Sequence, residues 1–296
     1  MNGFPIVVLA AGLIAPGASP SEPSVQLVTF DDLQRRFGEP HLRLLDARPQ
    51  GEYDKGHIPG AVRIDAKAVE KMAAKPGALT DRAAWEAWIA PLGIGPDTEV
   101  LVYDANRQLD AARLWWLLRY LGVGQVGLID GGFPLWEKQG RPVTAEPRKV
   151  EPRKFEVRFR TNQLATRDEV LGALKQGKVR VIDARSSQAE HTGVEKRAMR
   201  GGRVPTSCHL EWAQLVDADG RFLDEASLRA KLAKAGVKPG EPVITHCQGG
   251  GRASVDAFVF ERLGFPTRNY YLGWSDWGNV EDTPVETGPA TKPGPR

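Results

Sequence analysis

Cysteine is scarce in this sequence of 296 residues, which contains only Cys208 and Cys247. Two cysteines cannot form a disulfide framework or a cysteine-rich zinc site. A large excess of one charge is also missing, because 40 Lys and Arg residues are nearly balanced by 37 Asp and Glu residues, which leaves a net charge of +3. The basic residues are scattered along the chain, so we expect no nucleic-acid partner.

The sequence also offers no membrane span. The apolar run FPIVVLAAGLIA, residues 4–15, is too short to cross a bilayer, and a Pro- and Ser-rich spacer follows it. The run resembles the hydrophobic region of a secretory signal with a cleavage zone near Ala18, although no Lys or Arg precedes it. We therefore expect residues 1–24 to be the leader and spacer of a periplasmic or secreted protein. The alternatives are a buried first strand or a mis-assigned start, and a cytoplasmic location.

The length and the alternation of elements predict the fold class. A chain of this length is expected to form two domains. The segments LRLLDAR (42–48) and EVLVYD (99–104) have the composition of buried strands, and a strongly apolar helix is expected over 105–122. Strands that alternate with helices indicate an α/β fold, with parallel sheets flanked by helices.

The second half of the chain repeats the first. VRVIDAR, ending at Arg185, matches LRLLDAR, ending at Arg48, and VITHC places Cys247 where the first half has Asp104. These pairs are 137 and 143 residues apart, a separation that indicates tandem duplication. We expect domains over 25–145 and 160–288. Because the first copy lacks the cysteine, it is interpreted as a structural partner; the alternative is that Asp104 is a new catalytic acid.

The stretch PVITHCQGGGRAS, residues 242–254, carries the strongest chemical signal. It begins as a buried strand and leads into a helix, with a short glycine-rich loop between them. Glycines let backbone N–H groups approach a ligand closely, and with the helix N-terminus they favour a thiolate, which is the nucleophilic form of cysteine. A buried structural cysteine is the alternative, but it would require neither three glycines nor an arginine. The loop consists of Cys247, Gln248, Gly249, Gly250, Gly251 and Arg252.

The histidines do not suggest a metal site or a catalytic base. His246 directly follows a strand residue, so its side chain should project away from Cys247, and we interpret it as structural. His57 and His209 lie in loops after the two DAR segments, without metal-ligand spacing to another histidine. We therefore expect no metal.

On these motifs the chain resembles the rhodanese superfamily, specifically the tandem-domain thiosulfate and 3-mercaptopyruvate sulfurtransferases. The resemblance covers residues 25–288. It implies that Cys247 forms a persulfide, that the amides of the loop from Gln248 to Arg252 bind it, and that Arg185 binds the anion of the substrate. The segments that carry it are DARPQGEYDKGHIPGA, DARSS, RVP, HCQGGGRAS, GGFPLW and GWSDW.

The resemblance also implies the reaction. A small-molecule donor would pass a sulfur atom to Cys247, and a small-molecule acceptor would remove it, with no metal or organic cofactor. We expect a monomer. The loop has neither the Arg-Lys pair of vertebrate thiosulfate enzymes nor the Gly-Ser-Gly-Val-Thr of mercaptopyruvate enzymes, and RVPTSC replaces the usual HIPGA. Because Arg252 and Arg185 could hold a compact dianion, we expect thiosulfate to be the better donor and 3-mercaptopyruvate the second choice.

Three other functions or states are weighed against this one. Cell-cycle-type cysteine phosphatases have five residues between cysteine and arginine, whereas four separate Cys247 from Arg252. A non-catalytic binding or sensing module would not need an intact cysteine and arginine. In an oxidising compartment, Cys208 and Cys247 could instead form a disulfide.

Overall fold

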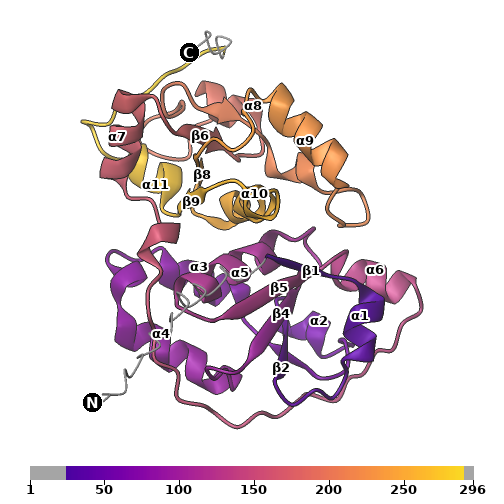
Figure 1. The fold of residues 1–296 in the computed structure, drawn as a ribbon. Helices are drawn as coiled ribbons and strands as arrows, with labels where there is room; N and C mark the ends of the chain where they lie inside the picture. Colours follow the sequence, from indigo (N-terminus) through magenta and orange to yellow (C-terminus); the bar gives the residue numbers. More distant parts are fainter. Residues whose placement is uncertain (1–24, 290–296) are drawn as a thin grey trace, which may run out of the picture.

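The computed structural model describes residues 25–289, and these form two α/β domains, each built on a parallel β-sheet (Figure 1). The fold class predicted from the alternation of strands and helices is confirmed. The predicted leader, residues 1–24, lies outside the described residues. Between residues 25 and 289, no helix is both long and apolar enough to cross a membrane.

The first domain contains a five-stranded sheet in the order β1-β5-β4-β2-β3, and every neighbouring pair is parallel. All five residues of β2 are buried, as expected for a sheet that helices cover on both faces. The strands are β1 (Gln26–Val28), β2 (Leu42–Asp46), β3 (Ala61–Arg63), β4 (Glu99–Tyr103) and β5 (Gln125–Ile129). The helices are α1 (Phe30–Arg35), α2 (Gln50–Tyr53), α3 (Ala66–Ala73), α4 (Arg82–Ile89), α5 (Leu109–Tyr120) and α6 (Gly132–Lys138), with short 3₁₀ turns η1 (Ala78–Thr80) and η2 (Ala90–Leu92).

The second domain repeats this arrangement with four parallel strands in the order β7-β6-β8-β9. This order matches β3-β2-β4-β5 of the first domain, so the duplication inferred from the sequence is also present in the strand order. The strands are β6 (Arg180–Asp183), β7 (Cys208–His209), β8 (Val243–His246) and β9 (Thr267–Tyr270). The helices are α7 (Arg167–Gln176), α8 (Gln188–Thr192), α9 (Glu225–Lys234), α10 (Gly251–Arg262) and α11 (Gly273–Trp277), with 3₁₀ turns η3 (Thr161–Gln163) and η4 (Trp212–Leu215).

The two domains meet where α5 packs against α10, between the sheets (Figure 1). Residues 111–120 of α5 are all buried, which explains the apolar composition of this helix, because a helix that is apolar all round is buried all round. Trp115 on α5 and Phe258 on α10 lie edge to face with their rings 5.0 Å apart, and one hydrophobic cluster extends through both domains. The end of α10 that carries the cysteine loop therefore lies close to the first domain.

Candidate active site

The cysteine loop connects β8 to α10 at the carboxyl end of an inner strand. β8 lies between β6 and β9, and Cys247 directly follows its last residue, His246. Parallel sheets bind ligands at the carboxyl ends of their strands, so the loop lies where a ligand is expected. The Cys247 residue is only 2% exposed, so it is largely shielded from bulk solvent.

Hydrogen bonds hold the carbonyl groups of this loop. The Cys247 carbonyl accepts from the Trp274 N–H at 2.8 Å, and the Gln248 carbonyl accepts from the Ser275 N–H at 3.0 Å. The Gly250 carbonyl accepts from the backbone N–H of Ser254 at 2.9 Å and from its hydroxyl at 2.8 Å. The carbonyls are thus turned onto donors of α10 and α11, which is what a cradle of N–H groups around Cys247 requires.

Two of the three loop glycines are required by the space around them. Gly250 has a φ of +82°, and a Cβ there would lie 2.4 Å from the ring of Tyr271. A Cβ on Gly251 would lie 2.3 Å from Nη2 of Arg113, a residue of the first domain. Around Gly249, in contrast, a Cβ would meet no atom within 4 Å. Glycine is therefore needed at the second position, a side chain at the third would have to displace the Arg113 guanidinium, and the first position has space for one.

Arg252 lies at the rim of the site and pairs with a carboxylate. Its Nη1 donates to Glu190 Oε2 at 2.8 Å and to the Ser186 hydroxyl at 3.0 Å. Burial by itself would lower the pKa of Arg252. The nearby Cys247 and Glu190 raise this pKa by more than burial lowers it, so it lies above its ordinary value. Glu190 is itself buried, and Nε of the half-exposed Arg197 lies 3.3 Å from it. The rim therefore holds two arginines around one carboxylate.

Sequence reasoning missed Glu190. In the sequence it lies three residues after Ser187, and the structure shows that the Ser187 hydroxyl caps α8 by accepting the Glu190 N–H at 3.0 Å. Ser-x-x-Glu is the ordinary pattern of a helix start. A local reading of the sequence therefore explains this glutamate as part of a helix cap and gives no sign of its contact with Arg252.

Arg185, predicted to bind the substrate anion, is buried and contacts groups of its own domain. Its Nη2 lies 2.6 Å from Asp183 Oδ2 and donates to the Gly202 carbonyl at 2.7 Å. Its guanidinium also lies over the ring of Trp274, 4.7 Å from the centroid. The residue is 1% exposed, so contact with a donor would require it to leave these partners.

The first domain, which has no cysteine, contains the same arrangement. Nη2 of Arg48 lies 2.6 Å from Asp46 Oδ2 and donates to the Gly56 carbonyl at 2.7 Å, with the guanidinium over the ring of Phe133. An arrangement that both repeats share is explained by the architecture of the strand end. Direct donor binding by Arg185 stays a prediction that the geometry does not favour.

Beside Arg185, the histidines form part of a buried polar cluster. His191 Nδ1 lies 2.8 Å from Asp183 Oδ2. Burial would raise the pKa of Asp183, but His246, His191 and Arg185 hold it well below its usual value. Burial also lowers the pKa of His246 to about 4, although Asp183 opposes this shift. His246 is thus neutral at physiological pH and fully buried, which agrees with its interpretation as a structural residue.

The two histidines predicted to lie in loops, His57 and His209, contact backbone carbonyls. His209 is in fact the last residue of β7. His57 contacts the carbonyls of Tyr53 and Glu146 at 2.9 and 3.1 Å, and His209 contacts that of Arg185 at 2.8 Å. Among the residues that the structure describes, no group of three or more His, Cys, Asp or Glu side chains could hold a metal ion.

In the first repeat, an anion occupies the corresponding loop. The carboxylate of Asp104 accepts four backbone N–H groups at 2.9–3.0 Å. Burial raises the pKa of Asp104 to about 6, and the residue is 1% exposed. This loop is therefore closed by its own side chain, which supports the interpretation of the first domain as a structural partner. The donors are Asn106, Gln108, Asp110 and Ala111.

The predicted alternative of a disulfide between Cys208 and Cys247 is wrong. The two cysteines form no disulfide, and β6 separates the strand of Cys208 from the strand that precedes Cys247. Cys208 pairs with Ile182, which in turn pairs with Thr245. Two strand spacings amount to roughly 9–10 Å, which exceeds the reach of about 7 Å between the Cα atoms of a disulfide.

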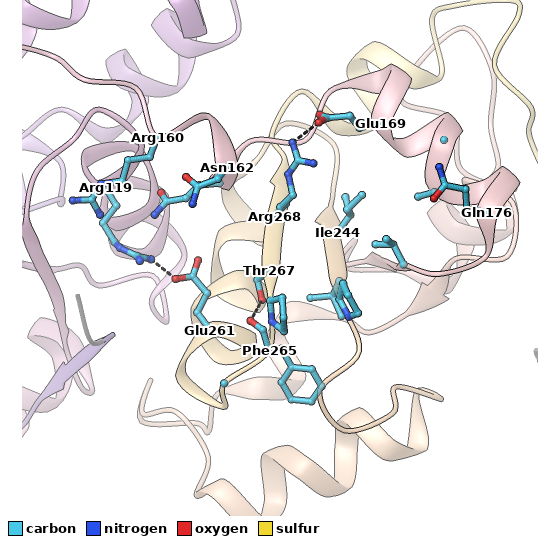
Figure 2. A pocket seen from close by; sticks show the side chains of 18 of the residues that line it. Arg119, Arg160, Asn162, Glu169, Gln176, Ile244, Glu261, Phe265, Thr267 and Arg268 are labelled. Atoms are coloured by element: carbon cyan, nitrogen blue, oxygen red, sulfur yellow. Dashed lines mark hydrogen bonds and ion pairs between the residues drawn. The ribbon is translucent and has the colours of Figure 1, made fainter. Parts of the chain in front are cut away.

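A large cavity lies away from the loop, at the amino ends of β8 and β9 (Figure 2). Its volume is about 1260 Å³. Its lining includes two ion pairs, Arg268 with Glu169 and Arg119 with Glu261. Its lining contains no cysteine. Because reactants bind at the carboxyl ends of parallel strands, we assign the chemistry to the Cys247 loop and not to this cavity.

Comparisons with known proteins agree with this architecture. The family model of the rhodanese-like domain matches residues 29–139 and 166–279. A thiosulfate sulfurtransferase from Azotobacter vinelandii is 32% identical, over 86% of this chain and 94% of that protein. A 3-mercaptopyruvate sulfurtransferase from Escherichia coli is 28% identical, over 88% of this chain and 97% of that protein. The crystal structure of SseA from Escherichia coli, a 3-mercaptopyruvate sulfotransferase, superposes with a TM-score of 0.72 and 25% identity, over 85% of this chain and 99% of that one.

Proposed function

Because this chain belongs to the rhodanese family, with two rhodanese-like domains in tandem, we propose that it is a sulfurtransferase that forms a persulfide at Cys247. One observation carries the proposal. The second repeat holds a buried cysteine at the point where the first repeat binds a carboxylate with four N–H groups. A loop of this kind suits an anionic sulfur, first as thiolate and then as persulfide.

The reaction proceeds in two displacements. The Cys247 thiolate attacks the outer sulfur of the donor; with thiosulfate, the sulfur–sulfur bond of the donor breaks and sulfite leaves with the electron pair. The acceptor then attacks the terminal sulfur of the persulfide; with cyanide, thiocyanate leaves and the thiolate is restored. Neither step consumes an external oxidant or reductant. The loop amides stabilise the charge on the terminal sulfur, as in an oxyanion hole.

We propose thiosulfate as the better donor and 3-mercaptopyruvate as the second. The rim arginine Arg252 and the half-exposed Arg197 supply two positive charges near the loop, and Glu190 offsets one of them. The binding of a compact dianion depends more on nearby positive charge than on the shape of the pocket. A keto acid would also need donors for its carboxylate and ketone, and the loop contains no serine or threonine to provide one.

Steady-state assays with each donor, using cyanide as the acceptor, test both levels of the proposal. We expect turnover with thiosulfate and a higher kcat/KM for it than for 3-mercaptopyruvate. The opposite order would overturn the ranking of donors but keep the reaction class. If an aryl phosphate is hydrolysed faster than either sulfur donor is consumed, or if neither donor leaves a persulfide that mass spectrometry detects on Cys247, the class itself is wrong.

We also propose that the protein is exported, on the basis of the apolar run over residues 4–15 and the spacer that follows it. Fractionation of the producing cell, followed by N-terminal sequencing of the mature protein, tests this. A new N-terminus near Ala18 in an extracytoplasmic fraction is expected. An intact Met1 on protein found in the cytoplasm would contradict export.

A further inference from the structure

An arginine of the first domain contacts the cysteine loop of the second. Arg113 lies on α5, is 6% exposed, and donates from Nη1 to the Gly249 carbonyl at 2.9 Å and to the Tyr271 hydroxyl at 3.2 Å. Its Nη2 donates to Glu70 Oε1 on α3 at 2.8 Å. The guanidinium also occupies the space that a side chain at Gly251 would need. Arg113 therefore links a carboxylate of the first domain to the centre of the loop.

This contact completes the set of bonds that fix the loop. The carbonyls of Cys247, Gln248 and Gly250 accept from donors of the second domain. The Gly249 carbonyl accepts from the Gly251 N–H at 3.1 Å, within the loop itself, and from Arg113. A turn made of three consecutive glycines has high conformational freedom. The hydrogen bond from Arg113 to the Gly249 carbonyl thus connects the glycine turn, the most flexible part of the loop, to the buried helix α5.

The position also places a positive charge beside the cysteine loop. Burial would lower the pKa of Arg113, but Tyr271, Glu70 and Cys247 raise it above its ordinary value, so the guanidinium is charged. A cation close to a thiolate stabilises the thiolate. Because Glu70 is half exposed, solvent screens its opposing charge more strongly than it screens the buried guanidinium.

We propose that Arg113 is a positioning residue of the active site, supplied by the non-catalytic repeat. It holds the Gly249 carbonyl so that the loop N–H groups face Cys247, and it adds its charge to the field that keeps the sulfur anionic. The first domain then has a direct part in the reaction, beyond its packing against the second. This inference rests on the sulfurtransferase proposed above.

The test is the pH dependence of alkylation of Cys247 by iodoacetamide, measured in a Cys208→Ser background so that one thiol reacts. In Arg113→Met, we expect the alkylation profile to move to higher pH, since a positive charge beside the loop is lost. Persulfide formation from thiosulfate at neutral pH should slow by about tenfold or more for the same reason. Arg113→Lys keeps the charge but has one nitrogen in place of the two that contact Gly249 and Glu70. Its alkylation midpoint should therefore rise less than that of Arg113→Met.

Arg119→Met is the matched control. Arg119 lies on the same helix, is also buried, and also pairs with a carboxylate of the second domain, Glu261. Its loss removes a comparable contact between the domains but leaves the loop untouched, so the alkylation midpoint should stay at the wild-type value. Gly251→Ala provides a second route if Arg113→Met does not fold, because the new methyl group displaces the guanidinium; its midpoint should also rise.

The outcomes separate this inference from the proposed function. A folded Arg113→Met protein with the wild-type alkylation profile would overturn the role of Arg113, whatever the donor assays show. An equal shift in Arg119→Met would also overturn it, by showing that any loosened domain contact suffices. If the wild type transfers no sulfur from either donor, the proposed function fails, while the alkylation profiles still report on Arg113.

Discussion

Asp104 and Cys247 occupy equivalent points of the two repeats, and their main-chain carbonyls accept equivalent bonds of 2.8 Å, from the N–H groups of Phe133 and Trp274. The side chains differ in their consequence. The Asp104 carboxylate fills its own loop permanently. Cys247 offers a single sulfur atom, which can gain a second sulfur and lose it again. The exchange of aspartate for cysteine, together with the glycines of the second loop, thus separates a structural loop from one that offers a sulfur atom.

The exchange of cysteine for serine tests the nucleophile. Cys247→Ser should reduce sulfur transfer to background with little change in folding, because a hydroxyl is similar in size but far less nucleophilic than a thiolate. Cys208→Ser should retain most of the activity, since Cys208 lies on β7, with β6 between it and β8. Thiocyanate production and circular dichroism measure the two effects. Activity of Cys247→Ser above a few per cent of wild type would place the chemistry elsewhere.

The glycines of the loop should differ in their tolerance of a methyl group. Gly249→Ala is expected to change the free energy of unfolding by less than about 0.5 kcal/mol, because the added Cβ meets open space. Gly250→Ala should lower it by about 1–3 kcal/mol, owing to the positive φ and the ring of Tyr271. Denaturant unfolding and thiocyanate assays check both variants. Equal losses at the two positions would show that the loop is shaped differently.

Arg48 and Arg185 form a matched pair, because they have the same partners in the two repeats. Arg48→Lys and Arg185→Lys should each lower the free energy of unfolding by about 1–3 kcal/mol, since lysine cannot hold a bidentate carboxylate and a carbonyl at once. The KM for thiosulfate should stay within about twofold of wild type in both. A clear rise in KM confined to Arg185→Lys would return that residue to the donor site.

His246 should make the protein sensitive to acid. Its pKa of about 4 lies below the ordinary value of 6.5, so between these values the unfolded chain binds more protons than the folded one. The stability that neutral His246 contributes is complete above pH 6.5 and is lost as the pH falls towards 4. Over that window the loss is about 3 kcal/mol.

The measurement is denaturant unfolding of the wild type and of His246→Asn from about pH 7 to about pH 4.5. The wild type should lose stability relative to the variant as the pH falls. The contribution of Asp104 to stability changes with pH in the opposite direction, because its pKa is raised to about 6. Asp104 is present in both proteins, so its contribution cancels in the difference between them. A pH-independent difference between wild type and His246→Asn would contradict the shift.

Much of this protein could be predicted from local sequence. The β-branched and aliphatic runs before Asp46, Asp183 and Cys247 specify buried strands, because such residues pack well on both faces of a sheet. The duplication was visible because equivalent strand ends need the same residues, as Arg48 and Arg185 show. The glycine loop was visible because glycine adopts a positive φ, as Gly250 does, without steric cost.

What the tertiary structure decided concerns side chains that are distant in sequence. Arg113 reads as one charge in an apolar helix, and only the packing of α5 on α10 brings it to Gly249, 136 residues later. Glu190 reads as a helix cap until Arg252 is placed beside it. The contacts of Arg185 with Asp183 and Gly202 are likewise seen only in the structure. The strands, the repeat and the candidate nucleophile Cys247 could be read from the sequence, since these depend on local composition. The partners of each charge depend on which elements meet in space, and that is set by the fold as a whole.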